Sequence, residues 1–482
     1  MPSNNNTFNA NSSQQDKCNH KDVTQHDAIE LELTATLIRP SLQAQPFLSA
    51  DGRRAFYIYT QAVDFPSGTP VPPPVFPPQS TLAAEIFNIG AGGDLVSLSQ
   101  ITLAQLSACV GQGVTITQID GGGAAEDFSR FVILADNTDR NVSGAKTGIG
   151  YLFALDQNLH ISKALALPDY PAVNNSLISA NFSPDNKHIV FTYSTTIPTS
   201  TPTPAVTRLR VINSSTLIDV VSTTLQGYTN GAKFFELCEC KSKSGECQKG
   251  QYRDLYVSVP TIGLNYSLTS TPTSTASSTL QFVGPSQLYV FKFCNNKLVP
   301  IDAASLPSFA IDFQVFQPSY GCVPYTLILT GGRAVDLDQS VFTALRPGVL
   351  GNDNRNQRLY LFDGVRLQLV YARALPQSTI PIAFDPRGQF IVNGSSDGRV
   401  ATCPGAFTLA KVKGIKEAVL EGCAVKLRID PFGIIRYANG QSSVIDINKS
   451  GDWLAFGGAA TGVTDGDSLN NVVLYRIVRA KC

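Results

Sequence analysis

Residues 182–193 read FSPDNKHIVFTY, in which two apolar runs stand on either side of a short polar turn. The same phrase returns as FLSADGRRAFYIY at 47–59, FDPRGQFIVNG at 384–394 and INKSGDWLAFG at 447–457. Asp, Pro, Asn and Gly at the corner supply the backbone angles that a tight turn between two strands needs. The sequence therefore repeats one β-hairpin at least four times.

The rest of the chain is also typical of β-structure. Short apolar runs rich in Val, Ile, Phe, Tyr and Thr are separated by Gly, Pro, Asn and Asp, and helical periodicity is scarce. Hydrophobic residues make up 43% of the 482 residues, which is enough for a large core. We therefore predict an all-β protein.

The predicted strands recur in sets of four, which is the pattern of a β-propeller blade. In the first set, PFLSA and RAFYIYT are followed after an insertion by LAAEIFNI and DLVSLSQ. Four sets are clear, near 45–106, 176–225, 309–375 and 379–438, and two fainter sets lie near 118–167 and 229–304. A last, incomplete set makes seven, so we predict a seven-bladed β-propeller, with six or eight blades as alternatives.

The last set has three strands, SVIDIN, DWLAFGG and VVLYRIVRA, after which the chain stops. Residues 28–37, AIELELTATL, form an apolar strand without a set of its own. Pairing this strand with the last three closes the ring and removes an exposed sheet edge. We predict one propeller domain over 28–482 behind a polar, flexible arm at 1–27. The alternative is two β-domains divided near the Ser/Thr/Pro-rich stretch at 267–279.

The phrase FSPDNKHIVFTY resembles the repeat of TolB-like and lactonase-like β-propellers, in which a Ser-Pro-Asp-Gly turn precedes an apolar second strand. SADGRRAFYI and DPRGQFIVNG fit this pattern less closely. The resemblance implies a propeller over most of 28–482. It implies no particular activity, because such families include hydrolases, electron-transfer enzymes and binding platforms.

Long insertions follow the second predicted strand of nearly every set. Because strands in a blade are antiparallel, all second-to-third connections should lie on one face of the ring. We predict that this insertion-rich face meets a protein partner, or a second copy in self-assembly. The insertions lie at 67–80, 136–148, 195–207, 267–279, 331–356, 395–422 and 459–470.

Charge and targeting signals narrow the range of partners. Lys and Arg together number 37, as do Asp and Glu, so the balance gives no reason to expect a nucleic-acid partner. No apolar run reaches the ~18 residues of a transmembrane helix, and the N-terminus lacks the apolar core of a secretory signal. Charged residues make up 15% of the chain, against about 25% in ordinary soluble domains. This surface favours an extracytoplasmic or particle-bound location.

Four of the ten cysteines are expected to lie on one face of one blade. LCECKSKSGEC places Cys238, Cys240 and Cys247 in a first-to-second turn, and Cys294 falls in the third-to-fourth turn of the same set. Their spacing lacks the paired C-x2-C knuckles of a structural zinc site. We predict disulfides here, with a four-thiolate metal site as the alternative.

Two further disulfides are predicted from position. Cys18 precedes the closing strand and Cys482 follows the strand that it would pair with, so a Cys18–Cys482 bridge would lock the ring. Cys403 and Cys423 bracket an insertion and could join its ends. Cys109 and Cys322 have no evident partners in the sequence.

Candidate metal ligands are few. The stretch TDGDSLN offers Asp465, Asp467 and Asn470, whose oxygens suit Ca²⁺ but fall short of a full calcium loop. The four histidines are scattered over predicted arm and blades, which argues against a three-His metal site. The run GGG at 121–123 is interpreted as a connector. No resident cofactor is expected, and Ca²⁺ is the one metal that the sequence suggests.

These patterns favour a non-enzymatic propeller that binds protein or supports assembly on an extracellular, particle or filament surface. The alternative is a hydrolase or oxidoreductase with a metal or cofactor in the central channel. An enzyme would need ionisable groups on the innermost strands, and those predicted strands offer few: Glu236, Asp312, Asp385 and Asp446.

Overall fold

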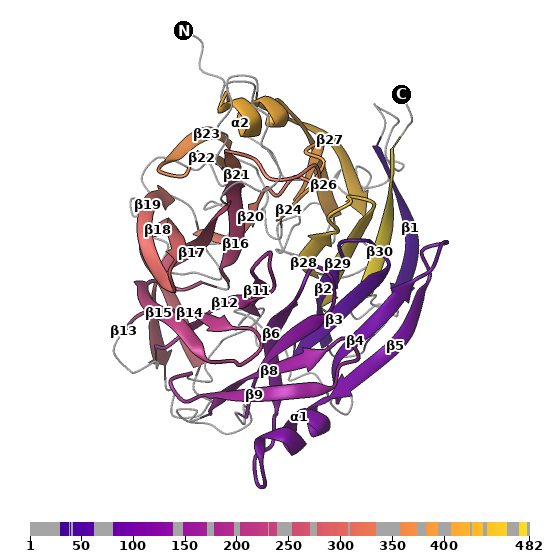
Figure 1. The fold of residues 1–482 in the computed structure, drawn as a ribbon, viewed down its shortest axis with the longest axis vertical. Helices are drawn as coiled ribbons and strands as arrows, with labels where there is room; N and C mark the ends of the chain where they lie inside the picture. Colours follow the sequence, from indigo (N-terminus) through magenta and orange to yellow (C-terminus); the bar gives the residue numbers. More distant parts are fainter. Residues whose placement is uncertain are drawn as a thin grey trace, which may run out of the picture.

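Seven antiparallel blades follow one another around a ring in the computed structural model of this chain, as Figure 1 shows. The described residues are 29–37, 39, 42–61, 81–137, 148–170, 178–196, 203–229, 231–238, 253–269, 277–306, 309–333, 357–373, 382–393, 406–424, 427–436, 441–459 and 472–479. The predicted arm at 1–27 lies outside them. The seven-bladed propeller predicted from the repeats is confirmed.

Blades 1 to 3 hold the first part of the chain. Blade 1 has β2 (Leu42–Leu48), β3 (Arg54–Gln61), β4 (Leu82–Ile89) and β5 (Leu95–Thr102). Blade 2 has β6 (Gln118–Ala124), β7 (Arg130–Asp136), β8 (Gly150–Asp156) and β9 (Ile161–Leu167). Blade 3 has β11 (Asn181–Phe182), β12 (His188–Ser194), β14 (Val206–Asn213) and β15 (Asp219–Gln226). The short strands β10 (Ile178–Ser179) and β13 (Thr203–Pro204) join the sheets of blades 2 and 4.

Blades 4 to 7 complete the ring. Blade 4 has β16 (Lys233–Cys238), β17 (Arg253–Thr269), β18 (Ser277–Cys294) and β19 (Lys297–Leu306). Blade 5 has β20 (Phe309–Val315), β21 (Thr326–Arg333), β22 (Gln357–Phe362) and β23 (Leu367–Arg373). Blade 6 has β24 (Ile382–Phe384), β25 (Phe390–Asn393), β26 (Ala406–Lys413) and β27 (Arg428–Arg436). Blade 7 has β28 (Gln441–Ile447), β29 (Trp453–Ala459), β30 (Val472–Arg479) and β1 (Ile29–Leu37).

The two ends of the described chain close the ring. β1 pairs antiparallel with β30, from Ile29 opposite Arg479 to Leu37 opposite Val472. Figure 1 shows the indigo β1 lying beside the yellow β30. Since β1 is the fourth strand of blade 7, the predicted closure by the N-terminal strand is confirmed.

The core of the ring lies between blades. The buried apolar residues fall into seven clusters, and each cluster draws on two neighbouring blades, the 7–1 pair included. Between blades 1 and 2, for example, the rings of Phe56 and Phe131 lie with centroids 4.3 Å apart. A blade therefore buries both of its faces only when the ring is complete.

Two blades differ from the sequence-based assignment. The inner strand of blade 2 is β6, so Gly121–Gly123 form part of a strand, and the connector interpretation was wrong. In the set at 379–438, hydrophobic alternation assigned the third strand to AVKLRID and the fourth to IIRYA, with a turn at Pro431–Gly433 between them. In the structure the third strand of blade 6 is β26, and Pro431–Gly433 are a bulged part of β27. Glycines and a proline favoured a turn in both places, and only strand pairing overrode that local preference.

The described residues contain two helices. α1 (Leu103–Val110) follows β5 and begins with a capping box between Thr102 and Gln105. α2 (Ile415–Glu421) lies between β26 and β27, where it buries Ala418 and Val419. Neither is long and apolar enough to cross a membrane.

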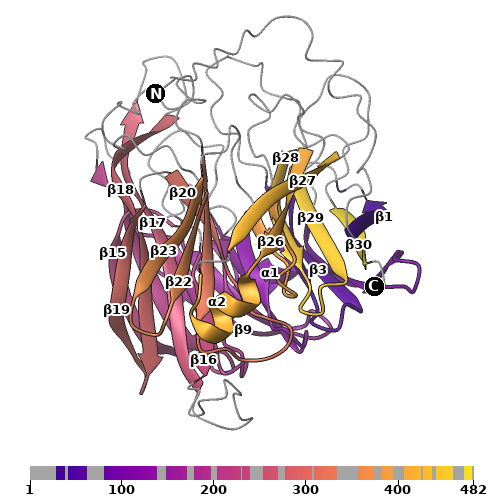
Figure 2. The ribbon, with the colours of Figure 1, turned by 90° about the horizontal axis from the view of Figure 1, so that it is seen from above.

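Because the strands of each blade are antiparallel, the connections between them lie on two opposite faces of the ring. Figure 2 shows the ring edge-on, with the strands running from one face to the other. First-to-second and third-to-fourth connections lie on what we name the turn face. Second-to-third connections lie on what we name the insertion face. On the described part of the turn face, several connections are short, such as 90–94 and 385–389.

Candidate functional site

The insertion face is framed by the ends of the second strands and the starts of the third. The residues between these strands are 62–81, 137–149, 270–276, 334–356, 394–405 and 460–471, with 195–205 interrupted by β13. The predicted insertions match these positions except at 395–422. Its second half holds β26 and α2, so that prediction was wrong there. Most of the residues in these connections lie outside the described part of the chain.

Polar side chains are buried where the second strands reach the insertion face. Asn393, at the end of β25, accepts a hydrogen bond from Gln357 Nε2 at 2.6 Å, and Arg373 Nε donates to Gln357 Oε1 at 3.0 Å. Such groups need partners when they are buried. The insertion face therefore rests on a layer of buried polar side chains, which includes Thr60, Asp136, Ser194, Thr330 and Asn393.

The turn face is built from the repeated hairpins. In blade 1, Ser49 Oγ donates to Asp51 Oδ1 at 2.7 Å and accepts the Arg54 N–H at 2.9 Å. In blade 3, Ser183 Oγ donates to Asp185 at 2.6 Å and accepts the His188 N–H at 2.9 Å. The repeated phrase thus encodes a side-chain bond that fixes each corner.

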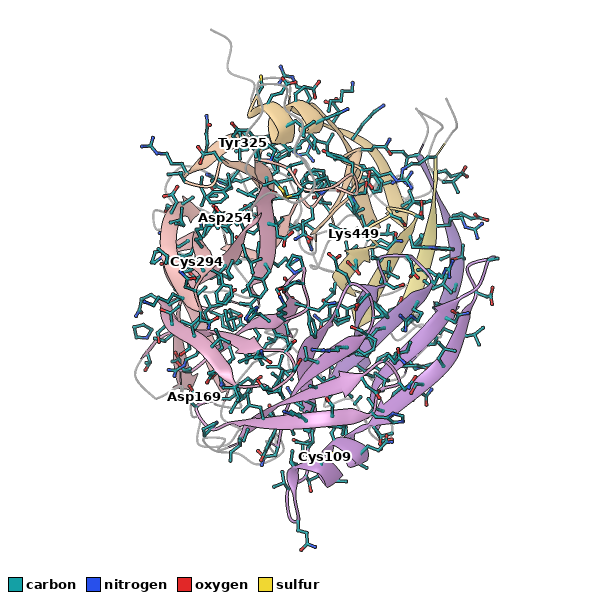
Figure 3. All side chains as sticks on the ribbon, viewed as in Figure 1. Cys109, Asp169, Asp254, Cys294, Tyr325 and Lys449 are labelled. Carbon is teal, nitrogen blue, oxygen red and sulfur yellow. A yellow bond between two sulfur atoms is a disulfide. The ribbon has the colours of Figure 1, made fainter. Side chains whose placement is uncertain are left out.

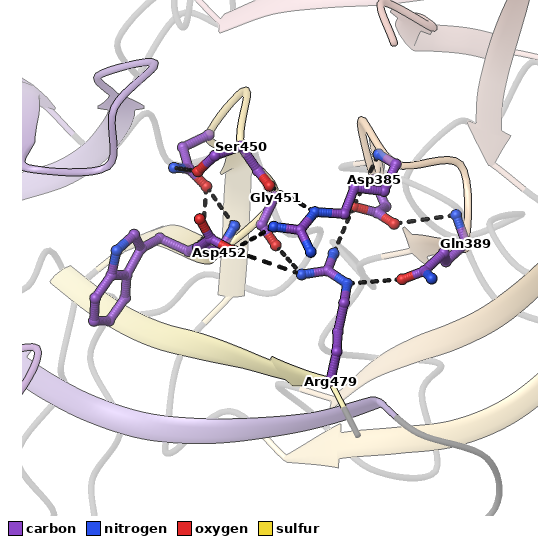
Figure 4. A network of polar contacts seen from close by, with 9 residues as sticks. Asp385, Gln389, Ser450, Gly451, Asp452 and Arg479 are labelled. Carbon is purple, nitrogen blue, oxygen red and sulfur yellow. Dashed lines mark hydrogen bonds and ion pairs between the residues drawn. The ribbon is translucent and has the colours of Figure 1, made fainter. Parts of the chain in front are cut away.

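A charged network joins the hairpins of blades 6 and 7, as Figure 4 shows. Arg479 donates to Asp385 at 2.9 Å and to Gln389 at 2.7 Å, and Arg387 donates to Asp452 at 2.7 Å. The Asp385 side chain is fully buried and that of Arg479 is 13% exposed. Burial raises the pKa of Asp385 and lowers that of Arg479, while each charge opposes the shift of the other.

Replacing Arg479 with methionine should lower the free energy of unfolding by about 2–3 kcal/mol, because Asp385 is left as a buried carboxylate without its cation. Urea unfolding at pH 7 measures the loss. Arg53→Met is the matched control, since the Arg53 side chain is 83% exposed and its loss should cost under about 0.5 kcal/mol. Equal losses in the two variants would contradict a structural role for the buried pair.

Ionisable groups also approach the centre of the ring from the inner strands. Asp446 on β28 accepts the Leu48 N–H at 2.7 Å, which ties blade 7 to blade 1. Lys233 on β16 donates to Gln314 at 2.6 Å. Burial raises the pKa of Asp446 to about 6, and the charge of Lys233 acts in the opposite direction. On the turn face, Lys449 in the hairpin of blade 7, labelled in Figure 3, forms an ion pair with Glu126 in the hairpin of blade 2, at 2.5 Å.

The raised pKa of Asp446 makes stability depend on pH. In the unfolded chain this carboxyl ionises near pH 4, whereas in the folded protein it ionises near pH 6. Between these two values the folded state therefore binds one more proton than the unfolded state. Its contribution is complete below pH 4 and is lost as pH rises through 6. Relative to Asp446→Asn, the wild-type free energy of unfolding should therefore fall by about 1–2 kcal/mol over that range. Parallel pH profiles for the two proteins, measured by urea unfolding, would contradict this assignment.

The predicted inner carboxylates occupy different places in the part of the chain that the structure describes. Asp446 lies on an inner strand, whereas Asp385 lies in a turn and pairs with Arg479. Glu236 lies on β16, and the side chain of Asp312 is outside the described residues. Sequence reasoning missed Asp120, because its segment was interpreted as a connector. The alternation of Gln118 and Asp120 before the glycines was the available signal.

Asp120 is the centre of a buried polar cluster in blade 2. Its carboxylate accepts hydrogen bonds from Gln118 Nε2 at 2.6 Å and from the Tyr170 hydroxyl at 2.7 Å. Gln118, Asp120 and Asp136 are each at most 1% exposed. Burial raises the pKa of Tyr170 well above its ordinary value, and the charges of Asp120 and Asp136 raise it further. The cluster lies at the insertion-face end of β6 and β7.

The cysteine pairing differs from the sequence-based prediction. Cys238 forms a disulfide with Cys322, with Cα atoms 5.8 Å apart, and this bond joins blade 4 to blade 5. Cys238 N–H also donates to the Val323 carbonyl at 3.1 Å. The partner of Cys238 lies in the neighbouring blade, 84 residues away in the sequence, so no local spacing of cysteines points to it. A disulfide closing a loop of this kind stabilises by about 2–4 kcal/mol.

Other cysteines fall into two groups. Cys294 and Cys423 are free thiols, which corrects the disulfides predicted for them, and Cys109 on α1 is free as well. Figure 3 shows Cys294 and Cys109 far apart at the rim of the ring. Cys423 follows α2 in a third-to-fourth connection, so it does not close an insertion. The remaining candidates lie outside the described residues: Cys18, Cys240, Cys247, Cys403 and Cys482.

The predicted calcium ligands Asp465, Asp467 and Asn470 also lie outside the described residues. Within the described part of the chain, no group of three or more His, Cys, Asp or Glu side chains could hold a metal ion. His160 is exposed beside Asp156 in blade 2, and His188 in blade 3 packs against Phe293 of blade 4. These two histidines therefore do not form a common site.

Comparisons with known proteins give no family for this chain. No family model matches the sequence, and no curated protein matches it either. Among solved structures, hydrazine synthase of Kuenenia stuttgartiensis is similar over 92% of this chain and 97% of its own, with a TM-score of 0.47 and 9% identity. At that level the likeness supports no inference about activity.

Proposed function

We propose that this chain is a non-enzymatic β-propeller that binds a protein partner, or a second copy of itself, through its insertion face. The observation that carries the proposal is the distribution of the connections. The second-to-third connections of all seven blades leave from one face, whereas most connections of the opposite face are five residues or shorter, with 239–252, 316–325 and 414–427 as the longer exceptions. Side-chain hydrogen bonds fix the short corners of that opposite face in blades 1 and 3. A rigid ring that presents many loops on one side is the usual architecture of a binding platform.

We also propose an extracellular, particle or filament surface as its location. Two features support this part of the proposal. Charged residues make up only 15% of the chain, and Cys238 and Cys322 form a disulfide, which persists in oxidising surroundings.

The second candidate is a hydrolase or oxidoreductase that works at the centre of the ring. One observation favours it: Asp446 lies on an inner strand with a pKa raised to about 6, and such shifts gather at catalytic sites. Its carboxylate already accepts the Leu48 N–H between two blades, and that role in holding the ring explains its burial. We therefore rank this candidate second.

The test places a photo-crosslinking phenylalanine analogue at single positions of the full chain. Phe76 and Phe342 lie in second-to-third connections of blades 1 and 5. Tyr320 is the matched control, because it is an aromatic side chain, 51% exposed, in a turn-face connection. Each variant is irradiated as the purified chain over a range of concentrations and within the producing cells or particles.

We expect covalent adducts at Phe76 or Phe342 and none at Tyr320. Adducts between two copies would identify self-assembly, and adducts with another chain would identify a partner. Adducts at Tyr320 alone, or at none of the three positions, would overturn the proposal.

A further inference from the structure

The buried polar cluster of blade 2 lies at an irregularity in the pairing of β6 with β7. The β6–β7 register shifts between Ile119 and Gly121, so Asp120 is the extra residue of a β-bulge. Residues two apart in a strand project from the same face, and Asp120 still lies on the face of Gln118, where its carboxylate accepts the hydrogen bond from Gln118 Nε2 at 2.6 Å. As the extra residue of the bulge, Asp120 has no directly opposed residue on β7.

Asp136 supplies a second carboxylate at the same place. It lies directly opposite Gln118 in the β6–β7 register, and directly opposed residues of an antiparallel pair project from the same face of the sheet. The charges of Asp120 and Asp136 both act on the hydroxyl of Tyr170. Two carboxylates and one amide thus converge around one phenol.

The amide oxygen of Gln118 points to a ligand. Gln118 is 1% exposed, its Nε2 donates to Asp120, and its Oε1 has no hydrogen-bond partner among the described residues. A buried hydrogen-bond acceptor without a partner lowers the stability of the fold by about 1–3 kcal/mol. Binding of a cation that accepts a lone pair from the Gln118 Oε1 atom is therefore favoured. Amide, carboxylate and phenol oxygens are all hard donors, which suit Ca²⁺ and not the softer transition metals.

We propose that Gln118, Asp120 and Asp136 form a binding site for a hard divalent cation, best matched by Ca²⁺. The site joins β6 to β7 at the insertion-face end of blade 2, beside Tyr170 in the connection to blade 3. It is separate from the stretch at 465–470 that the sequence suggested. With two carboxylates, its Kd should be in the range of about 0.1–1 mM.

The experiment uses the full chain after dialysis against a chelator. Adding 10 mM Ca²⁺ should raise the Tm of the wild-type protein by about 1–3 °C, and 10 mM Mg²⁺ should raise it less, because Mg²⁺ loses its water reluctantly. Asp120→Asn and Gln118→Leu should abolish the Ca²⁺-dependent rise. Asp467→Asn, the matched control at the other candidate, should retain it.

A second measurement does not depend on those variants folding. Tb³⁺ bound at this site should show emission sensitised by the tyrosine beside it, and Ca²⁺ should quench that emission by displacement. The sensitised emission should fall severalfold in Tyr170→Phe. The proposal is overturned if wild-type protein shows neither a Ca²⁺-dependent shift nor displaceable emission, or if both survive in the Asp120 and Gln118 variants.

Discussion

Removal of residues 1–37 should leave a protein that does not persist as a folded monomer. The deletion takes away β1, whose Ile29, Leu31, Ala35 and Leu37 pack against the clusters that join blade 7 to blades 6 and 1. It also strips β30 of a partner along its whole length. Four half-buried apolar side chains and a strand ladder together contribute about 5 kcal/mol, which approaches the whole stability of an ordinary domain.

The measurement is size-exclusion chromatography with urea unfolding of the soluble fraction. Both deletions are made in the Cys482→Ser background, so that the predicted Cys18–Cys482 bridge does not enter the comparison. Deletion of residues 1–27 alone is the control, and it should then change the free energy of unfolding by less than about 0.5 kcal/mol. A synthetic peptide of residues 28–41, added in trans, should restore part of the monomer because it can supply the missing strand. A stable, monomeric protein after removal of residues 1–37 would show that β1 does not close the ring.

Replacement of Gly121 with alanine should cost about 4–6 kcal/mol, the largest effect that we expect of any single substitution. Gly121 has a φ of +141°, and a Cβ there would meet the Ile178 carbonyl oxygen at 2.1 Å. β6 and β10 pair in parallel at this point, so blades 2 and 3 approach through their backbones. Both the backbone strain and the clash would have to be relieved by separating them.

Two further variants divide this cost. Gly123→Ala has no φ strain, but its Cβ would meet the Ala180 carbonyl oxygen at 1.9 Å, so about 3 kcal/mol should remain. Gly92→Ala is the matched control, because its Cβ would meet only Asp94, at 3.6 Å. Urea unfolding ranks the three. If Gly121→Ala were as mild as Gly92→Ala, the close backbone approach of blades 2 and 3 would be refuted.

The sequence predicted those features that depend on short stretches. The hairpins centred on Asp51, Asp185 and the turn after Phe384 carry their corner residues in the sequence, and alternation identified the flanking strands. The closing strand at 28–37 could be found because a set of three strands at one end of the chain needed a fourth.

Where local preference and strand pairing disagree, the sequence misled. Gly121–Gly123 favour a loop, yet they form a strand because they pair with β7. At Gly121 and Gly123 the backbone of 178–180 leaves no room for a side chain. Pro431–Gly433 of β27 favour a turn, yet they form a β-bulge that pairs with Leu409 and Ala410 of β26. Neither partner strand can be identified from the residues themselves.

The sequence by itself determined that this chain forms antiparallel four-stranded blades and that its two ends meet, because both follow from hydrophobic alternation and from turn chemistry within a few residues. Only the tertiary structure decided which groups face each other between blades: Cys238 with Cys322, Arg479 with Asp385, and the bulged Asp120 with Gln118 and Tyr170. The physical reason is that the core of a propeller lies between its repeats. Contacts across that core depend on how blades stack, and no periodicity along the chain records the stacking.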